Sequence, residues 1–345
     1  MNQRAARSAA ILDDFATATG VTSSLPPRRY LWTDAFAVST WVGLHQQSGE
    51  ARFLEQARRL ADQVHQVLGR YAPGDSRRGP IRGGLRIGKS LPERAAGEPY
   101  DPELEWDRDG QYYHYLTKWM QALLLLARVG GEERYLTSAR ELAQAAHRAF
   151  AYPPGAPSRL YWKMSVDLSR PLVASMGMHD PLDGVVTYAS LGLDAETAEM
   201  LRICAGRSWA TDDALGAGGL LVDALRLARL TAAGREALRP LFAQVRADAQ
   251  ESAEAVVRSA FTRLPAGRRL AFRELGFALG LHAVAPLADY AQVARLRPHV
   301  RLADELEDFW LEPANQAQPT WTEHGDINAV MLAASLAPGG CLSAG

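Results

Sequence analysis

The chain has 345 residues, of which 47% are hydrophobic and 22% are charged. This is an ordinary globular balance, with enough apolar material for one large domain or two average ones. Lys and Arg number 38 and Asp and Glu number 39, and this near-zero balance removes the usual electrostatic argument for a nucleic-acid partner. No apolar run reaches about 18 residues without a charge, so we expect no membrane span.

The cysteines and the N-terminal segment indicate a reducing compartment. Cys204 and Cys341 lie far apart in the sequence, and two cysteines cannot build a disulfide framework or a cysteine-based zinc site. The first twenty residues lack a continuous apolar stretch and carry Asp13 and Asp14, so they do not form a secretory signal. We therefore expect a cytoplasmic protein.

The first three predicted elements are helices. Residues 5–19 carry apolar side chains on one side, and Pro26 and Pro27 then break the chain. Residues 31–47 are apolar nearly all round, as a buried helix should be. After a short turn, residues 53–68 are strongly amphipathic. The pattern predicts a buried inner helix followed by an outer helix.

This helix pair recurs at a fixed offset. Residues 49–65 and 131–147 share identical residues at nine positions, which are Gly49, Glu50, Arg52, Leu54, Ala57, Arg58, Leu60, Ala61 and His65 in the first copy. Fixed-offset similarity marks a repeated supersecondary unit. Applied to the rest of the chain, the template predicts inner helices near 181–192, 211–231, 271–285 and 321–337. Outer helices are predicted near 194–206, 235–262 and 289–309. Inner and outer helices then number six each, with little strand.

The connections between these helices are asymmetric. Those after inner helices are short, whereas those before inner helices include the long segments 71–108, 151–178 and 311–320. The long segments must share one face, over the N-termini of the inner helices, and long patternless loops usually carry function. We predict an all-α single domain over residues 1–345, with these loops over an active-site face.

The arrangement resembles the (α/α)6 toroid of the six-hairpin glycosidase-like superfamily. Stretches such as YLWTDAF, EWDRDGQYYHYLTKWM and MHDPLDG are similar to blocks of a bacterial branch of that superfamily. The resemblance implies an enzyme that uses carboxylates, or histidines in the sugar epimerases, at the mouth of the barrel. It rests on helix count, repeat and loop asymmetry, so any activity carried over from it is an analogy.

Carboxylates stand near the start of every predicted inner helix. The candidate catalytic residues are Asp34, Asp107, Asp109, Asp180, His179 and Glu323. Glycoside hydrolysis needs a protonated acid and an ionised partner, which burial of neighbouring acids can provide. The alternative interpretation is helix capping, which Asp favours, and Asp212 and Asp213 fit it best. In MHDPLDG, Asp180 is either a cap ahead of Pro181 or an acid/base partner of His179.

Aromatic and basic residues accompany these acids. The predicted substrate-binding residues are Trp32, Tyr112, Tyr113, His114, Trp162, Trp321, His324, Arg86 and Lys89. Flat rings suit sugars or other apolar surfaces. With Arg78, Arg82 and Arg94, the basic residues form either a lid that receives a carboxylate or phosphate, or a solvated surface loop. Residues 83–90 fit a phosphate-loop pattern, but no strand precedes them, which indicates a chance match.

The remaining histidines favour structural roles. His65 and His147 fall near the C-termini of outer helices, where the helix dipole favours a positive charge, and His282 falls mid-helix. Glu323, His324 and Asp326 could contribute to a divalent metal site, but a site needs three or four converging ligands, so we expect no metal and no cofactor.

Three functions remain open. The first is a glycoside hydrolase-like enzyme that uses paired carboxylates in an aromatic-lined cleft. The second is a sugar epimerase, isomerase or cyclase that uses a histidine or a buried Asp as acid and base. The third is a non-catalytic binding protein. In each case the partner is a small molecule, either a sugar or a compound with an acidic group or an aromatic face, and neither a nucleic acid nor a membrane.

Overall fold

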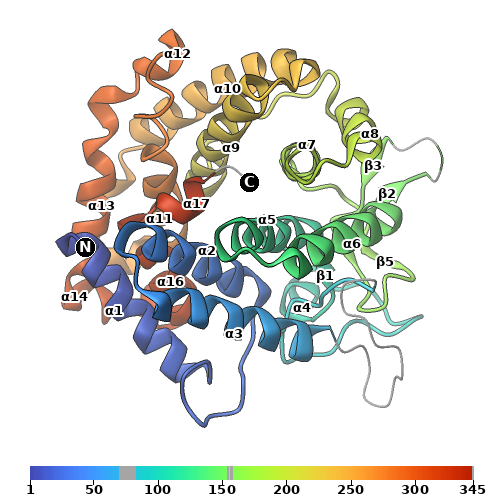
Figure 1. Ribbon diagram of the computed structural model, residues 1–345, viewed down its shortest axis with the longest axis horizontal. Helices are drawn as coiled ribbons and strands as arrows, with labels where there is room; N and C mark the ends of the chain where they lie inside the picture. The colour runs from blue at the N-terminus through green and yellow to red at the C-terminus, as the bar shows by residue number, and fades with distance from the viewer. Residues whose placement is uncertain (70–82, 154, 156–157, 344–345) are drawn as a thin grey trace. The chain divides into compact units, whose positions relative to one another are not determined.

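The computed structural model describes residues 1–69, 83–153, 155 and 158–343, and these are mostly helical (Figure 1). They group into two compact units. Unit 1 comprises Met1–Phe15, Gly43–Glu50 and Gly206–Ala344, and unit 2 comprises Ala16–Val42 and Ala51–Ala205. The single-domain organisation stays a prediction. Among the described residues, no helix has the length and apolar character that a membrane span requires.

Unit 2 holds the repeated hairpins predicted from the sequence. Its helices are the first part of α2 (Leu31–Ser48), α3 (Ala51–Leu68), α4 (Pro102–Asp107), α5 (Tyr113–Gly130), α6 (Glu133–Phe150), α7 (Asp180–Leu191) and α8 (Asp194–Cys204). The inner helix α5 packs against its outer partner α6 and against the next inner helix, α7 (Figure 1). Gly131 ends α5 in the left-handed conformation, with φ 72°, which glycine adopts without strain.

The repeat places equivalent histidines in equivalent positions with different surroundings. His65 on α3 accepts a hydrogen bond from the Trp119 indole of α5 at 3.1 Å. His147 on α6 packs edge-on against Tyr188 of α7 and lies 2.9 Å from the Glu199 carboxylate. Burial lowers the pKa of His65 to about 4, and the charge of Arg134 adds to the effect, so this ring is neutral. The predicted positive charge is therefore wrong for His65, because desolvation outweighs the helix dipole.

Short strands, which the sequence analysis did not identify, lie in the long connections of unit 2. Strands β1 (Gln111–Tyr112), β4 (Lys163–Met164) and β5 (Pro171–Val173) form an antiparallel sheet in the order β1-β4-β5. Strands β2 (Ala151–Tyr152) and β3 (Arg159–Leu160) form a second antiparallel pair. The register of β1 on β4 pairs Tyr112 with Lys163. The sheet thereby ties the residues just before α5 to the segment that precedes α7.

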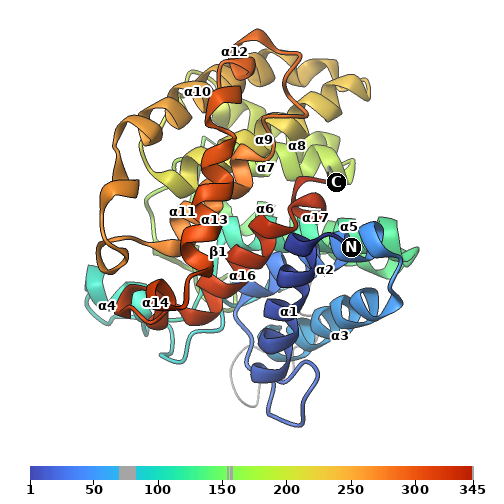
Figure 2. The ribbon, with the colours of Figure 1, turned by 90° about the vertical axis from the view of Figure 1, so that its left-hand side faces the viewer.

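Unit 1 is built around α9 and α11. Its helices are most of α1 (Gln3–Ala18), α9 (Ala214–Ala232), α10 (Arg239–Arg258), α11 (Ala271–Leu281), α12 (Ala291–Ala294), α13 (Arg301–Leu311), α14 (Pro313–Gln316), α15 (Pro319–Thr322), α16 (Gly325–Leu336) and α17 (Gly339–Leu342). Helix α11 packs against α9, α13 and α16, and α10 covers α9 (Figure 2). The predicted last outer helix, 289–309, is interrupted and is regular only in α12 and α13.

Glycines allow α9 and α11 to approach closely. A Cβ atom added to Gly218 would lie 2.1 Å from the carbonyl oxygen of Gly276, and one added to Gly280 would lie 2.4 Å from the Cα of Gly218. Real Cβ atoms do not approach other heavy atoms this closely. The contact between α9 and α11 therefore requires glycine, which has no Cβ atom, at positions 218 and 280. The neighbouring Gly219 faces open space, with nothing within 4 Å of an added Cβ.

These adjacent glycines provide a matched test of the helix contact. We expect Gly218→Ala to reduce the free energy of unfolding by about 1–3 kcal/mol, because the backbones of α9 and α11 must separate. Gly219→Ala should instead be neutral or stabilising by about 0.5–1 kcal/mol, because alanine favours a helix interior. Urea denaturation of both variants measures the difference, and equal stabilities would contradict the proposed contact.

Candidate functional site

The loop that enters α5 is fixed by a buried lysine. The Lys163 side chain is 0% exposed, and its ammonium donates to the Glu105 carboxylate at 2.9 Å and to the carbonyl oxygens of Glu105 and Arg108 at 2.6 and 2.9 Å. Arg94 binds the other Glu105 carboxylate oxygen at 2.9 Å. Glu105 is itself buried. Its charge is therefore balanced by two cations, as a buried carboxylate requires.

Asp109, two residues before β1, is held in the same manner. Its carboxylate accepts a hydrogen bond from Arg86 at 2.6 Å and another from the backbone N–H of Gly88 at 3.0 Å. The segment from Gly83 to Ser90 is irregular, and the backbone of Ile87 bonds to Gly110 and Leu31. No helix follows it within residues 91–101, and the residues before Gly83 lie outside the described part of the chain, so the interpretation as a chance match stays a prediction.

Aromatic rings form a continuous cluster beside these loops. The aromatic cluster consists of Tyr30, Trp32, Trp106, Tyr112, His114, Tyr115 and Trp162. Tyr112 is central, with its ring centroid 5.5 Å from that of His114, 5.2 Å from that of Tyr115 and 5.9 Å from that of Trp162. Trp106 stands edge-on to Trp162 at 4.8 Å and is 52% exposed. The cluster therefore presents flat apolar faces that extend from the interior to solvent.

Two helices bring a titratable group of residues to the edge of this cluster. His114 and Lys118 lie one turn apart on α5, and Asp180 and Asp183 lie one turn apart on α7. The Lys118 ammonium donates to Asp183 at 2.7 Å. His114 Nδ1 lies 3.6 Å from Asp180 Oδ1. Because Trp32, Tyr112 and Tyr115 all contact His114, this group adjoins the aromatic cluster.

Asp180 is the carboxyl with the most unusual environment among these residues. It is only 4% exposed, and its Oδ2 is buried without a hydrogen-bond partner. Burial raises its pKa to about 8, and the charge of Asp183 adds to the increase, whereas the Gly177 backbone and Lys118 oppose it. A Cβ atom added to Gly177 would lie 2.5 Å from Asp180 Oδ2. The Asp180 carboxyl fits here because residue 177 is a glycine and has no Cβ atom. Asp180 is therefore protonated at neutral pH.

His114 has the opposite shift. About a quarter of its side chain is exposed, at 26%. Desolvation nevertheless lowers its pKa to about 4, with Lys118 adding to the decrease and Asp183 opposing it. The imidazole is neutral at pH 7. A carboxylic acid able to donate a proton thus stands beside an imidazole able to accept one, which are the two roles of acid–base chemistry.

The other candidates in unit 2 have varied surroundings. Asp34 is fully buried, 3.5 Å from Arg29, and accepts a hydrogen bond from the Tyr30 N–H at 3.1 Å. Asp107 is exposed at the end of α4. His179 is half-buried and is the residue just before α7. Asp180 is the first residue of α7, so it is not the N-cap of that helix. Tyr113 is fully buried and donates to the Tyr188 hydroxyl at 2.9 Å.

The remaining candidates lie in unit 1. Glu323 and His324 are exposed between α15 and α16, and the His324 ring stands edge-on to Phe272 at 6.0 Å. Trp321 is buried and stacks on Trp310 at 5.7 Å. Asp213, interpreted as a cap, does cap α9, with its carboxylate accepting from the Gly216 N–H at 2.9 Å.

Lys118 and Tyr115 belong to this site but were not predicted from the sequence. Both precede the long apolar part of α5, where they read as ordinary helix residues. The signal that could have identified Lys118 is its spacing: it follows His114 by four positions, and Asp183 follows Asp180 by three. Each pair therefore shares one helix face.

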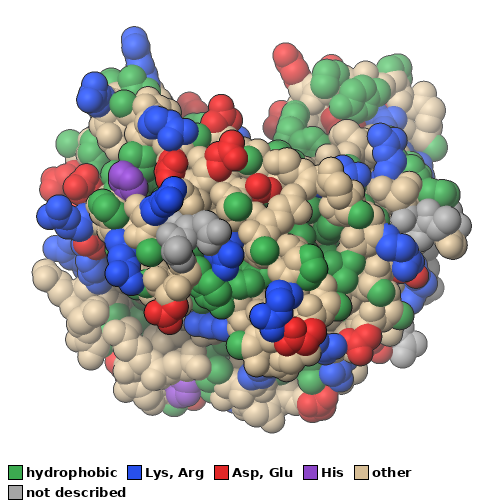
Figure 3. Space-filling model, turned by 90° about the horizontal axis from the view of Figure 1, so that it is seen from above, with side chains coloured by type: hydrophobic (Ala, Val, Ile, Leu, Met, Phe, Trp, Pro, Cys, Tyr) green, Lys and Arg blue, Asp and Glu red, His purple; other side chains and the backbone are tan. Residues whose placement is uncertain are grey.

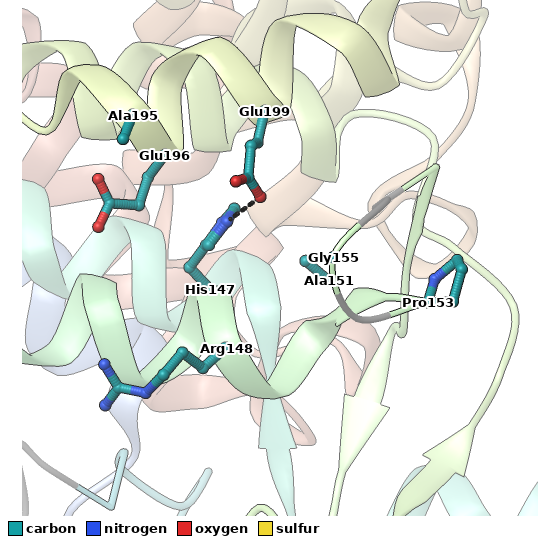
Figure 4. A pocket seen from close by; sticks show the side chains of 8 residues that line it. All are labelled: His147, Arg148, Ala151, Pro153, Gly155, Ala195, Glu196 and Glu199. Atoms are coloured by element: carbon teal, nitrogen blue, oxygen red, sulfur yellow. Dashed lines mark hydrogen bonds and ion pairs between the residues drawn. The ribbon is translucent and has the colours of Figure 1, made fainter.

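A separate pocket of about 310 Å³ lies between α6 and α8 (Figure 4). It is lined by His147, Arg148, Ala151, Pro153, Gly155, Ala195, Glu196 and Glu199. His147 and Glu199 face each other across 2.9 Å, and Figure 4 shows Glu196 and Arg148 pointing away from this pair. Of the described residues that line it, His147 alone is aromatic, so this lining does not match the stacked rings of the aromatic cluster.

Charges elsewhere do not single out another site. Figure 3 shows acidic and basic side chains interspersed over one face, in keeping with the near-zero net charge. Within the described part of the chain, no group of three or more His, Cys, Asp or Glu side chains is placed to hold a metal ion. Cys204 and Cys341 are both buried.

Comparison with solved structures gives the class of the fold, which is an (α/α)6 toroid, as predicted. The GH76A alpha-1,6-mannanase from Salegentibacter sp. HEL1_6 is similar with a TM-score of 0.59 and 11% identity, covering 99% of this chain and 100% of that one. An inactive variant of this mannanase with two adjacent aspartates replaced, in complex with alpha-1,6-mannotriose, matches with a TM-score of 0.57, 12% identity and the same coverage.

Sugar epimerases share the same fold. The cellobiose 2-epimerase from Spirochaeta thermophila DSM 6192 matches with a TM-score of 0.55 and 12% identity, covering 90% of this chain and 86% of that one. No family model matches the sequence, and no curated protein matches it. At such low identities the comparisons establish the fold, while activity must be argued from the site.

The buried lysine gives a testable prediction about the architecture of the site. Lys163→Met should reduce the free energy of unfolding by about 3–5 kcal/mol, because it removes one partner of a buried ion pair and leaves two carbonyl oxygens unpaired. Lys89→Met is the matched control: it also flanks the Tyr112 ring, but it forms no ion pair among the described residues, so its stability should change little. Chemical denaturation of both variants measures this, and equal losses would contradict the assignment.

Proposed function

We propose that this protein is a carbohydrate-processing enzyme in which Asp180 is the general acid. The observation that carries the proposal is the protonated Asp180 carboxyl, in contact range of a neutral His114 at the edge of the aromatic cluster. The fold is shared with mannanases and sugar epimerases, which supports a sugar as the substrate. Flat rings such as Trp106, Trp162 and Tyr112 suit the apolar faces of pyranoses.

The first candidate reaction is glycoside hydrolysis. Asp180 donates its proton to the leaving oxygen as the glycosidic bond breaks. Hydrolysis also needs an ionised carboxylate as base or nucleophile, and Asp183 takes this role because the Lys118 ammonium stabilises its charge. The sequence suggested two carboxylates from Asp34, Asp107, Asp109, Asp180 and Glu323. Asp180 is retained in the proposed reaction, with Asp183 as its partner. Asp183 also lies one turn from Asp180 on α7, whereas Asp109 is bound by Arg86 and the Gly88 N–H in the loop that precedes β1.

The second candidate reaction is epimerisation or isomerisation, and the state of His114 favours it. A neutral imidazole can remove a proton from carbon next to a carbonyl group, while Asp180 protonates the carbonyl oxygen. The products separate the candidates: hydrolysis releases a new reducing end, whereas epimerisation in deuterated water places deuterium on carbon without breaking the glycosidic bond. Alpha-1,6-linked mannosides and cellobiose are the first substrates to assay.

The two shifted groups predict a bell-shaped pH profile. Activity needs protonated Asp180, so it should fall above about pH 8, and it needs neutral His114, so it should fall below about pH 4. Asp180→Asn should lower kcat by about 10²–10⁴-fold and abolish the alkaline limb, because an amide has no proton to donate. Turnover of the panel by wild type and variant, with the fold checked by circular dichroism, tests this. Full activity of the asparagine variant would overturn the proposed role.

Asp183→Asn tests whether the two carboxyls are coupled. Removing the Asp183 charge should lower the pKa of Asp180, because a neighbouring negative charge disfavours ionisation. The alkaline limb should therefore move to lower pH. The acid limb should also move to lower pH, because the charge of Asp183 raises the pKa of His114 and the variant lacks it. The measurement is kcat/KM against pH for the residual activity, and unchanged limbs would show that the groups are independent.

A further inference from the structure

The lysines of this chain are confined to one region. Only three of the 38 Lys and Arg residues are lysines, namely Lys89, Lys118 and Lys163, and all three lie in unit 2 beside the groups described above. Elsewhere the chain uses arginine for every permanent positive charge. Lysine differs from arginine in carrying a compact charge whose three donors are free to rotate.

The partners of these lysines differ. The ammonium of Lys118 is bound to Asp183, and that of Lys163 is bound to Glu105 and to two carbonyl oxygens. Lys89 forms neither a hydrogen bond nor an ion pair with the described residues, and its contact is with the Tyr112 ring, 5.8 Å from the centroid. It is half-buried. Among the described residues, Lys89 is thus a partly desolvated cation without a counter-ion contact.

The acids near Lys89 do not neutralise it. Glu105 is bound by Arg94 and Lys163, and Asp109 by Arg86 and a backbone N–H. Asp107 is exposed to solvent, which screens its charge. Desolvation lowers the pKa of Lys89, the charge of Lys163 adds to the decrease, and the three acids oppose it more weakly. A ligand anion would supply the charge that these acids do not.

We propose that Lys89 binds a carboxylate on the substrate, so that the enzyme acts on sugars that carry a uronic acid. This inference rests on the proposed function. Lys89 and His114 both contact Tyr112, which places the ammonium close enough to the acid–base pair for a substituent on the same sugar or on its neighbour. A single ammonium matches a single carboxylate. A phosphate dianion would need more cations, and Arg86 and Arg94 are already bound to acids.

Calorimetry with monosaccharides tests the proposal without requiring turnover. D-glucuronate, D-glucose and D-glucose 6-phosphate differ only in the group at carbon 6. Wild type should bind glucuronate about 5–30-fold more tightly than glucose, the range expected for a charge-assisted hydrogen bond. Lys89→Met should remove this difference, and Lys89→Arg should retain most of it. Equal binding of glucuronate and glucose by wild type, or tighter binding of the phosphate, would overturn the proposal, and so would absence of glucuronate binding.

Amine labelling provides a second readout. Lys89 should be acylated faster than Lys118 and Lys163, because its ammonium, unlike theirs, has no hydrogen-bond partner among the described residues and its side chain is only half-buried. Glucuronate should protect Lys89 from acylation, as measured by peptide mass spectrometry, and glucose should protect it less. If both sugars protect it equally, charge recognition is excluded. Failure of the acid–base assignment would appear instead as full turnover by Asp180→Asn with uronate discrimination intact, so the two proposals fail in different experiments.

Discussion

The buried ammonium of Lys163 is the interaction on which the site depends. It joins the end of α4 to strand β4, since it binds the Glu105 carboxylate and the carbonyl oxygens of Glu105 and Arg108. Strand β4 in turn pairs with β1, whose Tyr112 is the centre of the aromatic cluster. Fully burying a charge is costly unless every donor is used, and here all three N–H groups have acceptors. The long connections before α5 and α7 are thus fixed to each other.

This arrangement divides the carboxylates of unit 2 into two kinds. Glu105, Asp109 and Asp34 are buried with cationic partners, and their charges hold loops and helix starts in place. Asp180 is buried with an unpartnered oxygen and keeps its proton. Electrostatics therefore separates acids that are ionised in ion pairs from an acid that keeps its proton, within one small region. Burial alone does not distinguish them; a direct ion pair with an arginine does, whereas the nearest cation named for Asp180, Lys118, is paired with Asp183.

Much of the fold could be predicted from the sequence, because the repeat and the apolar periodicity are local signals. The inner helices α2, α5 and α7 begin within a few residues of their predicted starts, and the resemblance to the toroid is confirmed by the solved structures. The strands were missed because two- or three-residue strands carry no period, and they form only through pairing of distant segments. Unit 1 was predicted less accurately near residues 289–300, where turns interrupt the helix.

The site was harder to predict, for a physical reason. Asp109 and Asp180 both precede or begin an inner helix, and nothing in the local sequence distinguishes them. What separates them is that Arg86, 23 positions away, reaches Asp109, whereas α5 presents His114 to Asp180. Partners of this kind depend on tertiary packing, so a single sequence identified the acids but not their ionisation.

The close approach of the Asp180 carboxyl to Gly177 has an evolutionary consequence. The Asp180 carboxyl occupies the volume that any larger residue at position 177 would need. The two positions are therefore expected to covary among descendants of a common ancestor. A lineage that exchanged the glycine would have to move or discard the aspartate, and one that lost the aspartate would no longer be under selection to keep the glycine.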